Sequence, residues 1–283
     1  MILSLLKLIN KILKNFVKFL KNIQKLKGVY TITELLKQLH AYNDNKIHLL
    51  KLKNFYNNIF NKPKLIFDIG CNVGDYTKTF LKFSDFVVAV DPNIEVINQL
   101  RNSTVDFISK KKLKTMNVAI SNQIGEVKLY INSSCTVSSI NKKWQKSALP
   151  EMFPHVHNVD TEIVKSTTLD NLVKEFGIPD YIKLDIEGGE LNALIGLNQP
   201  INILSFETTL PIFHEETIKI LHKISSLGEY QFKLLEYGEY QFLDTTFSKD
   251  QIIKSIISKQ LKGVIDIFCF KKGSNYVRNL INN

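Results

Sequence analysis

The sequence predicts an α/β protein with a doubly wound, mostly parallel sheet, preceded by a helical appendage. Two observations lead to this fold class. After Pro63, short apolar runs of strand length alternate with longer stretches of helical or loop character, as in sheets whose strands are joined by helices. The first run leads through a glycine-rich turn directly into a helical stretch, as in the first unit of many such sheets. We therefore expect an appendage over residues 1–60 and an α/β domain over residues 61–283.

The appendage has the pattern of basic, amphipathic helices. Between Ile2 and Leu26, lysines recur at steps of three and four residues and therefore line one helix face, while apolar side chains fill much of the rest. No apolar run here approaches the ~20 residues that a membrane span requires. Gly28 is expected to cap this helix, and Thr31–Leu52 is expected to continue as helix, with the appendage ending near Asn61-Lys62-Pro63.

Two interpretations of the first helix remain open. In one, residues 1–27 lie on an anionic membrane surface, with lysines toward the headgroups and leucine and phenylalanine toward the acyl chains. In the other, the helix packs on the main domain or on a second subunit. Packing on a second subunit would make the protein a homo-oligomer.

The positive charge of the chain is concentrated in the appendage. The formal net charge is +10, and residues 1–60 hold eleven lysines against Glu34 and Asp44. The rest of the chain, with 26 basic and 25 acidic residues, is nearly neutral, which argues against a nucleic-acid partner. Its three cysteines are far apart and form no C-x-x-C pair. We therefore expect a cytoplasmic protein, peripheral on the inner membrane face if the helix binds lipid.

Seven apolar runs after Pro63 are predicted as strands of the main sheet. They are Leu65–Ile69, Phe86–Val90, Lys114–Ala119, Tyr181–Leu184, Ile201–Phe206, Gln231–Leu235 and Val264–Phe270. The last two are expected to form an antiparallel edge pair. Gly125–Ile131 and Thr161–Ser166 are predicted as extra strands, inserted before the fourth main strand.

The turn after the first strand predicts a nucleotide-type cofactor. Asp68, Gly70, Asn72 and Gly74 alternate along it, and a glycine-rich turn between a strand and a helix lets a ligand approach the backbone amides. A dinucleotide-binding turn has the pattern G-x-G-x-x-G, which this turn lacks. The Asp68 carboxylate would repel a pyrophosphate but could accept hydrogen bonds from a cationic amino group. S-adenosylmethionine is therefore favoured, and an NAD-dependent oxidoreductase is the alternative.

Two further strand ends are expected beside this cofactor. The second strand ends at Asp91, seventeen residues after Gly74, near the offset at which an acidic residue meets ribose hydroxyls in nucleotide-binding sheets. Ala119, at the next strand end, would lie beside the adenine, although core packing explains the apolar residues around it equally well. The cofactor-binding candidates are thus Asp68, Gly70, Asn72, Gly74, Asp91 and Ala119, together with Asp185 described next.

The fourth main strand ends in an unusual acidic segment, Tyr181–Glu190. Lys183 lies inside an apolar strand, and Asp185, Glu187 and Glu190 follow it; buried charges of this kind are costly unless they are paired or used. By strand order this end adjoins the methionine end of the cofactor. The structural alternative is that Lys183 neutralises Asp185 and that Glu190 begins a helix.

Methyl transfer to a hydroxyl requires the nucleophile to be positioned and its proton removed. Asp185 or Glu187 could be the base, with Lys183 tuning it, and His214 is a competing candidate. Asp185, Glu187 and Glu207 could instead bind a divalent cation such as Mg²⁺ through oxygen ligands, so the need for a metal stays open.

These segments resemble the FkbM family of S-adenosylmethionine-dependent methyltransferases. The resemblance spans residues 64–210 and rests on Phe67–Tyr76, Val90–Asn93, Asn117–Ser121, Ser138–Ile140, Thr168–Asp170 and, most specifically, Ile182–Glu190. It implies a Rossmann-like methyltransferase fold and O-methylation of a hydroxyl, on a sugar of a surface polysaccharide or on a related small-molecule metabolite. It also implies cofactor contacts at Asp68, Gly70, Asn72 and Asp91.

The sequence departs from the family pattern at two positions. Asp91 stands where members often have Glu, and Gly189 where Ala is usual; neither change is expected to abolish binding. A third class of function is a membrane-associated binding protein without catalysis, against which the intact Asp68, Asp91, Asp185 and Glu187 argue.

Overall fold

The structure, a computed structural model, describes residues 2–21, 27–60, 62–243 and 245–274. The chain divides into two compact units, Met1–Tyr56 and Asn57–Asn283, called here the N-terminal and the C-terminal unit.

The N-terminal unit is built from helices, as predicted. Helix α1 covers Ile2–Lys21, and α2 begins at Lys27 and continues to Ile59. The side chain of Asn10 on α1 donates a hydrogen bond to Asp44 on α2. Gly28 does not cap the first helix, because it lies in the first turn of α2; residues 22–26, where the first helix was expected to end, lie outside the described residues. None of the helices described has the length and hydropathy of a membrane span.

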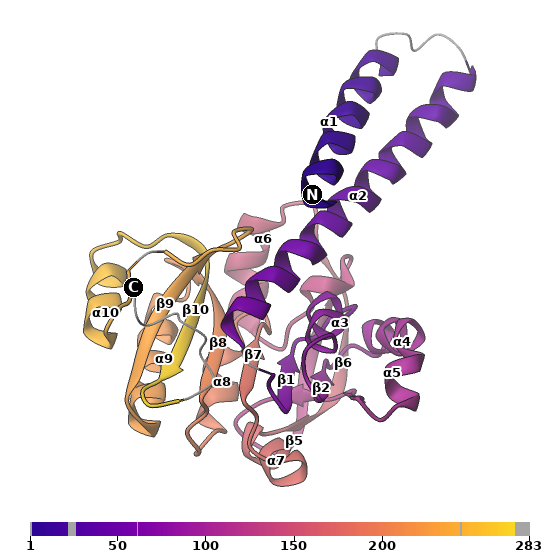
Figure 1. Cartoon of the computed structure of the whole chain (residues 1–283). Coiled ribbons are helices and arrows are strands. Elements are labelled where there is room, and N and C mark those ends of the chain that lie inside the picture. Colours follow the sequence, from indigo (N-terminus) through magenta and orange to yellow (C-terminus); the bar gives the residue numbers. More distant parts are fainter. Residues whose placement is uncertain (1, 22–26, 61, 244, 275–283) are drawn as a thin grey trace. The chain divides into compact units, whose positions relative to one another are not determined.

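The main sheet of the C-terminal unit has seven strands in the order β3-β2-β1-β7-β8-β10-β9 (Figure 1). Their bounds are β1 Leu65–Ile69, β2 Phe86–Val90, β3 Leu113–Met116, β7 Tyr181–Leu184, β8 Ile203–Leu210, β9 Tyr230–Glu236 and β10 Gly263–Lys271. The first five in this order are parallel, and β10 runs antiparallel to both β8 and β9. The predicted fold class and the antiparallel pair are confirmed, with β10 inserted between β8 and β9.

A second, smaller sheet has the order β4-β6-β5. It contains β4 Ala119–Ile120 and the two predicted extra strands, β5 Gly125–Asn132 and β6 Asn158–Thr167. The prediction of one strand over Lys114–Ala119 was wrong, because the chain leaves the main sheet after Met116. The Asn117 side-chain amide, which donates to the carbonyl oxygens of Asp91 and Pro92, fixes this change of direction.

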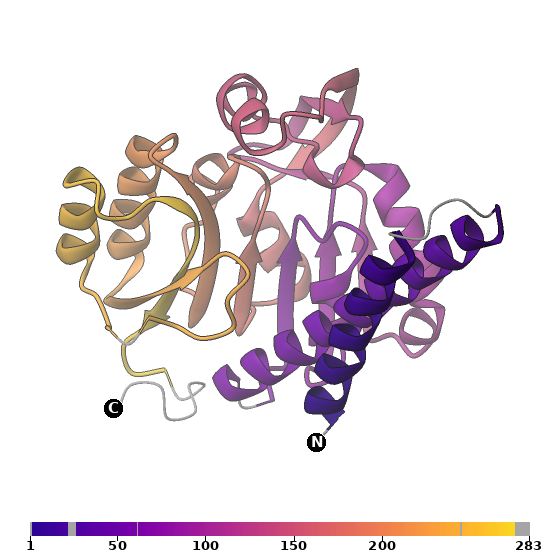
Figure 2. The same ribbon diagram turned by 90° about the horizontal axis from the view of Figure 1, so that it is seen from above.

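Helices cover both faces of the main sheet, as Figures 1 and 2 show for the C-terminal unit. The remaining α-helices are α3 Asp75–Phe80, α4 Ile94–Ser103, α5 Val105–Ser109, α6 Leu149–Met152, α7 Leu169–Phe176, α8 Glu190–Ile195, α9 His214–Leu227 and α10 Lys249–Ile257. Helices α7 to α10 bury their apolar residues with Phe67, Ile182 and Phe206 in the main core. Helix α3 contacts β1 and β2, and its side of the sheet also carries Asp68 and Lys183, which are register partners on β1 and β7.

Candidate active site

The glycine turn brings the ends of β1 and β7 into close approach. Gly70 has φ +81°, and a β-carbon on it would lie 1.7 Å from the carbonyl oxygen of Asp185, so no other residue fits without displacing the backbone. Gly74, with φ +92°, precedes the first turn of α3. The backbone thus requires glycine at both positions: Gly70 because of the close approach, and Gly74 because of the left-handed conformation that precedes the helix.

Asp91 ties this turn to the end of β2. Its Oδ2 accepts a hydrogen bond from the backbone N–H of Asn72 at 3.1 Å, and its Oδ1 accepts one from the N–H of Asn93 at 2.9 Å. The backbone N–H groups of Gly70 and Cys71 donate to the Val90 carbonyl. Burial raises the pKa of Asp91 to about 6 despite these bonds. The predicted ribose-binding carboxylate is therefore held rigidly beside the turn, with lone pairs left to accept from hydroxyls.

Asp68 is fully buried at the start of the same turn. Thr77 of α3 donates its hydroxyl to Asp68 Oδ2 at 2.5 Å. The other oxygen, Oδ1, has no hydrogen-bond partner among the described residues. Burial raises the pKa of this carboxyl group to about 6, although the charge of Lys183 opposes the shift. A buried acceptor without a donor is costly, and a ligand that brings a cationic amino group to this position would satisfy it.

Lys183 is the cation at the centre of the site. It is buried, its Nζ donates to Asp185 Oδ2 at 2.7 Å, and it lies 4.1 Å from the centroid of the Tyr76 ring. Burial alone would lower the pKa of Lys183, but the nearby Asp185, together with Tyr76, Asp266 and Asp68, raises it well above its ordinary value. The expected pairing of Lys183 with Asp185 is present, and it keeps the ammonium charged inside the protein.

Three further carboxyl groups gather around this pair, and we call Asp185, Glu187, Glu207 and Asp266 the acid cluster. Glu207 on β8 and Asp266 on β10 are directly paired in register, and Asp185 follows the end of β7, the parallel neighbour of β8. Burial, with the charges of Asp185, Glu187 and Asp266, raises the pKa of Glu207 well above its ordinary value; burial also raises that of Asp266, to about 6.

Glu187 has the most strained position in the cluster. Its φ is +55°, a left-handed conformation that only a small fraction of non-glycine residues adopts. Its Oε2 is buried and has no hydrogen-bond partner among the described residues. Burial and the charges of Asp185 and Glu190 raise the pKa of Glu187 well above its ordinary value. The carboxyl group is thus held ready to accept a proton or a hydrogen bond.

A connection from the smaller sheet holds Glu187 in this conformation. Ser139 donates its hydroxyl to the Glu187 carbonyl at 2.7 Å, and the Asn141 side chain donates to the carbonyl of Gly188. Phe213 fills the space at Gly188, where a β-carbon would lie 2.7 Å from its ring. Phe213 itself is buried with Trp144 in a small apolar cluster, where the two rings are stacked.

Glu190 has a structural contact that matches one of the predicted alternatives. It is the first residue of α8, and its Oε1 accepts a hydrogen bond from the backbone N–H of Ile186 at 2.9 Å. Burial raises its pKa to about 7. Glu190 therefore closes the turn that carries Glu187.

The family is decided by the match of a family model. The model described as the methyltransferase FkbM domain matches residues 68–252, which include the glycine turn, Asp91 and three members of the acid cluster. The chain belongs to the FkbM methyltransferase family. Membership implies S-adenosylmethionine as the cofactor and decides against the NAD-dependent alternative.

Solved structures give similar folds at low sequence identity. The methyltransferase FkbM from Methylobacillus flagellatus KT is 14% identical with a TM-score of 0.46, covering 89% of this chain and 57% of its own. This chain thus spans little more than half of that protein. The precorrin-6y C5,15-methyltransferase from Geobacter metallireducens GS-15 is 10% identical with a TM-score of 0.39, covering 81% of this chain and 87% of its own. An S-adenosylmethionine-dependent O-methyltransferase from Thermotoga maritima is also 10% identical, with a TM-score of 0.38, covering 81% of this chain and 64% of its own. No curated protein matches the chain significantly.

Within this FkbM domain, the structure bears differently on the two remaining predicted roles. His214 is exposed at the start of α9, where its Nδ1 lies 2.9 Å from the carbonyl oxygen of Pro211; this contact occupies only one ring nitrogen, and its role as a competing base stays a prediction. Asp185, Glu187 and Glu207 were considered as ligands of a divalent cation, but no group of three or more His, Cys, Asp or Glu side chains in the described parts of the chain has an arrangement that could hold a metal ion.

The structure adds residues that the sequence prediction missed. Asp266 joins the acid cluster from β10, Thr77 binds Asp68, and Tyr76 covers Lys183. Asp266 carried a usable signal, because it is a lone carboxylate in the apolar run Val264–Phe270, the same kind of anomaly that identified Lys183. Ala119 is buried in β4, where its place is explained by packing in the smaller sheet.

Proposed function

We propose that this FkbM-family enzyme transfers a methyl group from S-adenosylmethionine to a hydroxyl group of a sugar, of a polysaccharide or of a related metabolite, and that it works in the cytoplasm. The observation that carries the proposal is Glu187, whose buried Oε2 has no hydrogen-bond partner in the part of the chain that the structure describes and whose backbone is strained. It lies beyond the strand end that meets the glycine turn at Gly70.

The residues of the glycine turn fit the cofactor. Asp68 Oδ1 is a buried acceptor to which no described residue donates, so it is suited to the amino group of the methionine part. The Asp91 carboxylate is suited to the ribose hydroxyls. Bound S-adenosylmethionine supplies an electrophilic methyl group on a sulfonium centre. The charge of Asp185 helps to raise the pKa of both Asp68 and Asp91, so these two carboxyl groups interact electrostatically with a member of the acid cluster.

Glu187 is the candidate proton acceptor. A raised pKa makes an ionised carboxylate a stronger base than usual, and Oε2 of Glu187 has a free lone pair. Asp185, held through Oδ2 by Lys183, is suited to accept a hydrogen bond from the attacking hydroxyl and so to orient it. We therefore propose Glu187 as the base, a choice that the sequence leaves open.

A polyhydroxylated acceptor fits the acid cluster best. Sugars present several hydroxyl donors within a few ångströms, and the carboxyl groups of Glu207 and Asp266 add acceptors on adjacent strands. An acceptor bearing a phosphate or carboxylate close to the reacting hydroxyl would be repelled by these groups. The proposed acceptor is therefore a neutral sugar ring at the point of reaction.

Calorimetry and a product assay test the proposal separately. The protein is expected to bind S-adenosylmethionine and its demethylated product, and Glu187→Gln is expected to keep this binding while lowering turnover at least about a hundredfold, the usual scale for a general base. Glu126→Gln, an exposed carboxylate on β5, is the matched control. Transfer would be followed by mass spectrometry on a panel of neutral and anionic sugars.

The outcomes separate the enzyme from the non-catalytic alternative. Absence of cofactor binding in the wild type would remove the core of the proposal. Tight cofactor binding without methyl transfer to any hydroxyl of the panel, and without an effect of Glu187→Gln on cofactor turnover, would instead support a binding protein on a methyltransferase fold.

A further inference from the structure

We propose that α1 binds an anionic lipid surface through its exposed apolar side chains and its lysines. The proposal concerns the N-terminal unit alone and does not depend on the acceptor or on the chemistry of the C-terminal unit. It rests on the way three kinds of side chain are distributed around this helix.

One face of α1 is used inside the unit. Leu6 and Asn10 are buried, one turn apart on the helix, and Asn10 is hydrogen-bonded to Asp44 of α2. Residues spaced four apart lie on the same side of a helix. This side is therefore occupied by protein, and any partner must bind α1 from another direction.

A second face is apolar and exposed. Leu8 is 54% exposed, Ile12 is 59% exposed and Ile9, beside them, is 36% exposed. Leu8 and Ile12 again differ by four positions, so their side chains lie next to each other on the helix surface. A contiguous exposed apolar patch rimmed by polar residues is a feature of interaction sites.

A third face carries the charge. Lys7, Lys11 and Lys14 are exposed, and their spacing of four and three residues places them together on a side away from the apolar face. This is the pattern of an interfacial helix, which inserts apolar side chains at the headgroup boundary while lysine ammonium groups remain at the polar surface. The helix is only about 10 Å wide, so these charges act within a Debye length of the lipid phosphates.

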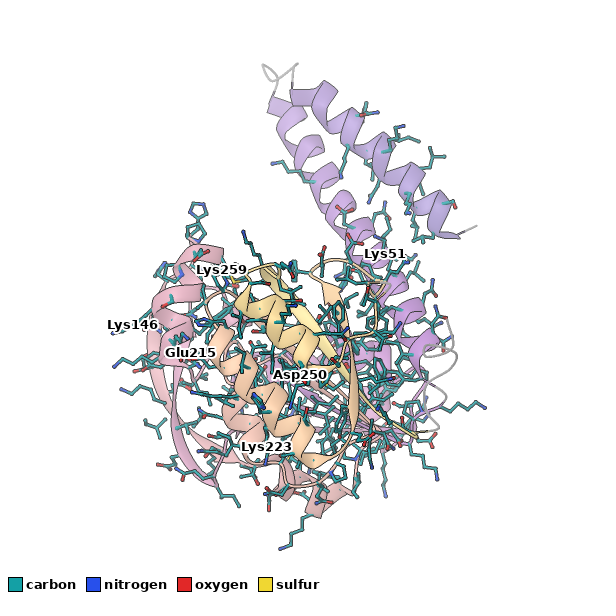
Figure 3. The ribbon with its side chains drawn as sticks, turned by 90° about the vertical axis from the view of Figure 1, so that its left-hand side faces the viewer. Lys51, Lys146, Glu215, Lys223, Asp250 and Lys259 are labelled. Atoms are coloured by element: carbon teal, nitrogen blue, oxygen red, sulfur yellow. The ribbon has the colours of Figure 1, made fainter. Side chains whose placement is uncertain are left out.

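Charge favours a lipid surface over a second copy of the chain. The first 60 residues hold eleven lysines and only two acidic residues, so two such units brought together would repel each other. The rest of the chain has no such imbalance, with 26 basic and 25 acidic residues. On the side of the C-terminal unit seen in Figure 3, residues of both signs are labelled, namely Lys146, Glu215, Lys223, Asp250 and Lys259. The N-terminal unit therefore has the composition of a cationic binding element, and an anionic bilayer supplies both the charge and the apolar layer that it lacks.

Cosedimentation of the full chain with lipid vesicles tests the proposal. Binding is expected to vesicles of phosphatidylcholine mixed with phosphatidylglycerol, to be much weaker with phosphatidylcholine alone, and to fall with added salt. The triple variant Lys7→Gln, Lys11→Gln, Lys14→Gln is expected to bind roughly a hundredfold more weakly, at about fivefold for each lysine. The double variant Leu8→Glu, Ile12→Glu is expected to lose binding without losing the helix.

The matched control is Lys110→Gln, Lys111→Gln, Lys112→Gln, which removes the same charge from an exposed segment of the C-terminal unit. Equal binding to both kinds of vesicle would overturn the proposal, as would equal losses in the two triple variants. A salt-stable dimer in light scattering, converted to a monomer by the Leu8 and Ile12 changes, would assign the apolar face to a second copy instead. Thermal unfolding and binding of S-adenosylmethionine, measured on every variant, show whether each protein is folded.

Discussion

A β-carbon on Gly70 would lie 1.7 Å from the carbonyl oxygen of Asp185, so the cofactor turn and the acidic strand end lie too close to admit a side chain between them. Gly70→Ala is expected to destabilise the fold by about 3 to 5 kcal/mol, because a steric clash adds to the cost of a left-handed backbone. Gly238 separates the two costs: its φ is +80° and nothing lies within 4 Å of a β-carbon there. Gly238→Ala should cost only about 1 to 2 kcal/mol in urea unfolding. Equal losses would mean that the close approach does not constrain the site.

The affinity for S-adenosylmethionine should depend on pH through Asp68. Its pKa is raised to about 6 by burial, and the ionised form is the one that attracts a cationic amino group. We expect the dissociation constant, measured by calorimetry, to be flat above pH of about 7 and to rise roughly tenfold per pH unit below about 6. Asp68→Asn should bind weakly with a flatter profile, whereas Asp106→Asn, an exposed change on α5, should behave as the wild type. A flat wild-type profile would contradict the assignment of Asp68 to the amino group.

The fold should become more stable on mild acidification. The pKa values of Asp68, Asp266 and Glu190 are raised by burial to about 6, 6 and 7, above those of the unfolded chain, so the protonated forms stabilise the native state. This contribution is fully present below pH of about 4 and is lost as the pH rises through 6 to 7. We expect the midpoint of thermal unfolding, without cofactor, to be higher at pH 5.5 than at pH 8, and Glu190→Gln to reduce the difference. A midpoint that falls steadily on acidification would mean that these carboxyl groups are stabilised as anions.

Removing the central cation should be strongly destabilising. Lys183 is buried and forms an ion pair with Asp185. Lys183→Met therefore leaves buried carboxylates without a counter-charge and is expected to lower the free energy of unfolding by about 3 to 5 kcal/mol near neutral pH. The cost should shrink at pH 5, below the pKa of about 6 of the neighbouring Asp68 and Asp266. Chemical unfolding at both pH values measures it. A loss that does not change with pH would indicate that Lys183 acts through packing rather than charge.

Replacing Glu187 by glycine should relieve backbone strain and at the same time abolish activity. Because its φ is +55°, Glu187→Gly is expected to relieve roughly 1 kcal/mol of backbone strain, in addition to removing a buried carboxyl group. Glu187→Gln removes the charge and keeps the strain, so the difference between the two variants in unfolding free energy combines the relieved backbone strain with the loss of the remaining side chain and the greater freedom of glycine in the unfolded chain. Both variants should lose methyl transfer. An active Glu187→Gly would exclude the side chain from the chemistry.

The elements that the sequence predicted best are those whose ends carry local signals. Strands β1, β2 and β7 begin and end at the predicted residues, because each is a short apolar run closed by an aspartate or a glycine turn. The break between β3 and β4 could not be predicted in this way. It depends on Asn117 donating to carbonyl groups about 25 residues earlier in the chain, a contact that no local pattern reports.

The site residues that follow one another along a single strand end could be predicted from the sequence. Those that are brought together from different strands could not. Lys183, Asp185 and Glu187 are close in sequence, and their charge among apolar residues is conspicuous. Asp266 is a comparable anomaly, but its relevance depends on β10 lying between β8 and β9, which places it opposite Glu207. The same limit applies to Ser139 and Asn141, whose hydrogen bonds to the turn at Glu187 span 48 and 47 residues.

The insertion of β10 between β8 and β9 also imposes an order on biosynthesis. The ribosome releases β8 and β9 before β10, so each is left with an unpaired edge until residues 263–271 have emerged. Exposed strand edges of this kind invite association with other chains. Asp266 arrives with the same strand, and the charge balance around Lys183 is therefore completed only in the last stage of synthesis of the sheet. Slow decoding of the codons after β9 would lengthen the interval in which a nascent chain can aggregate.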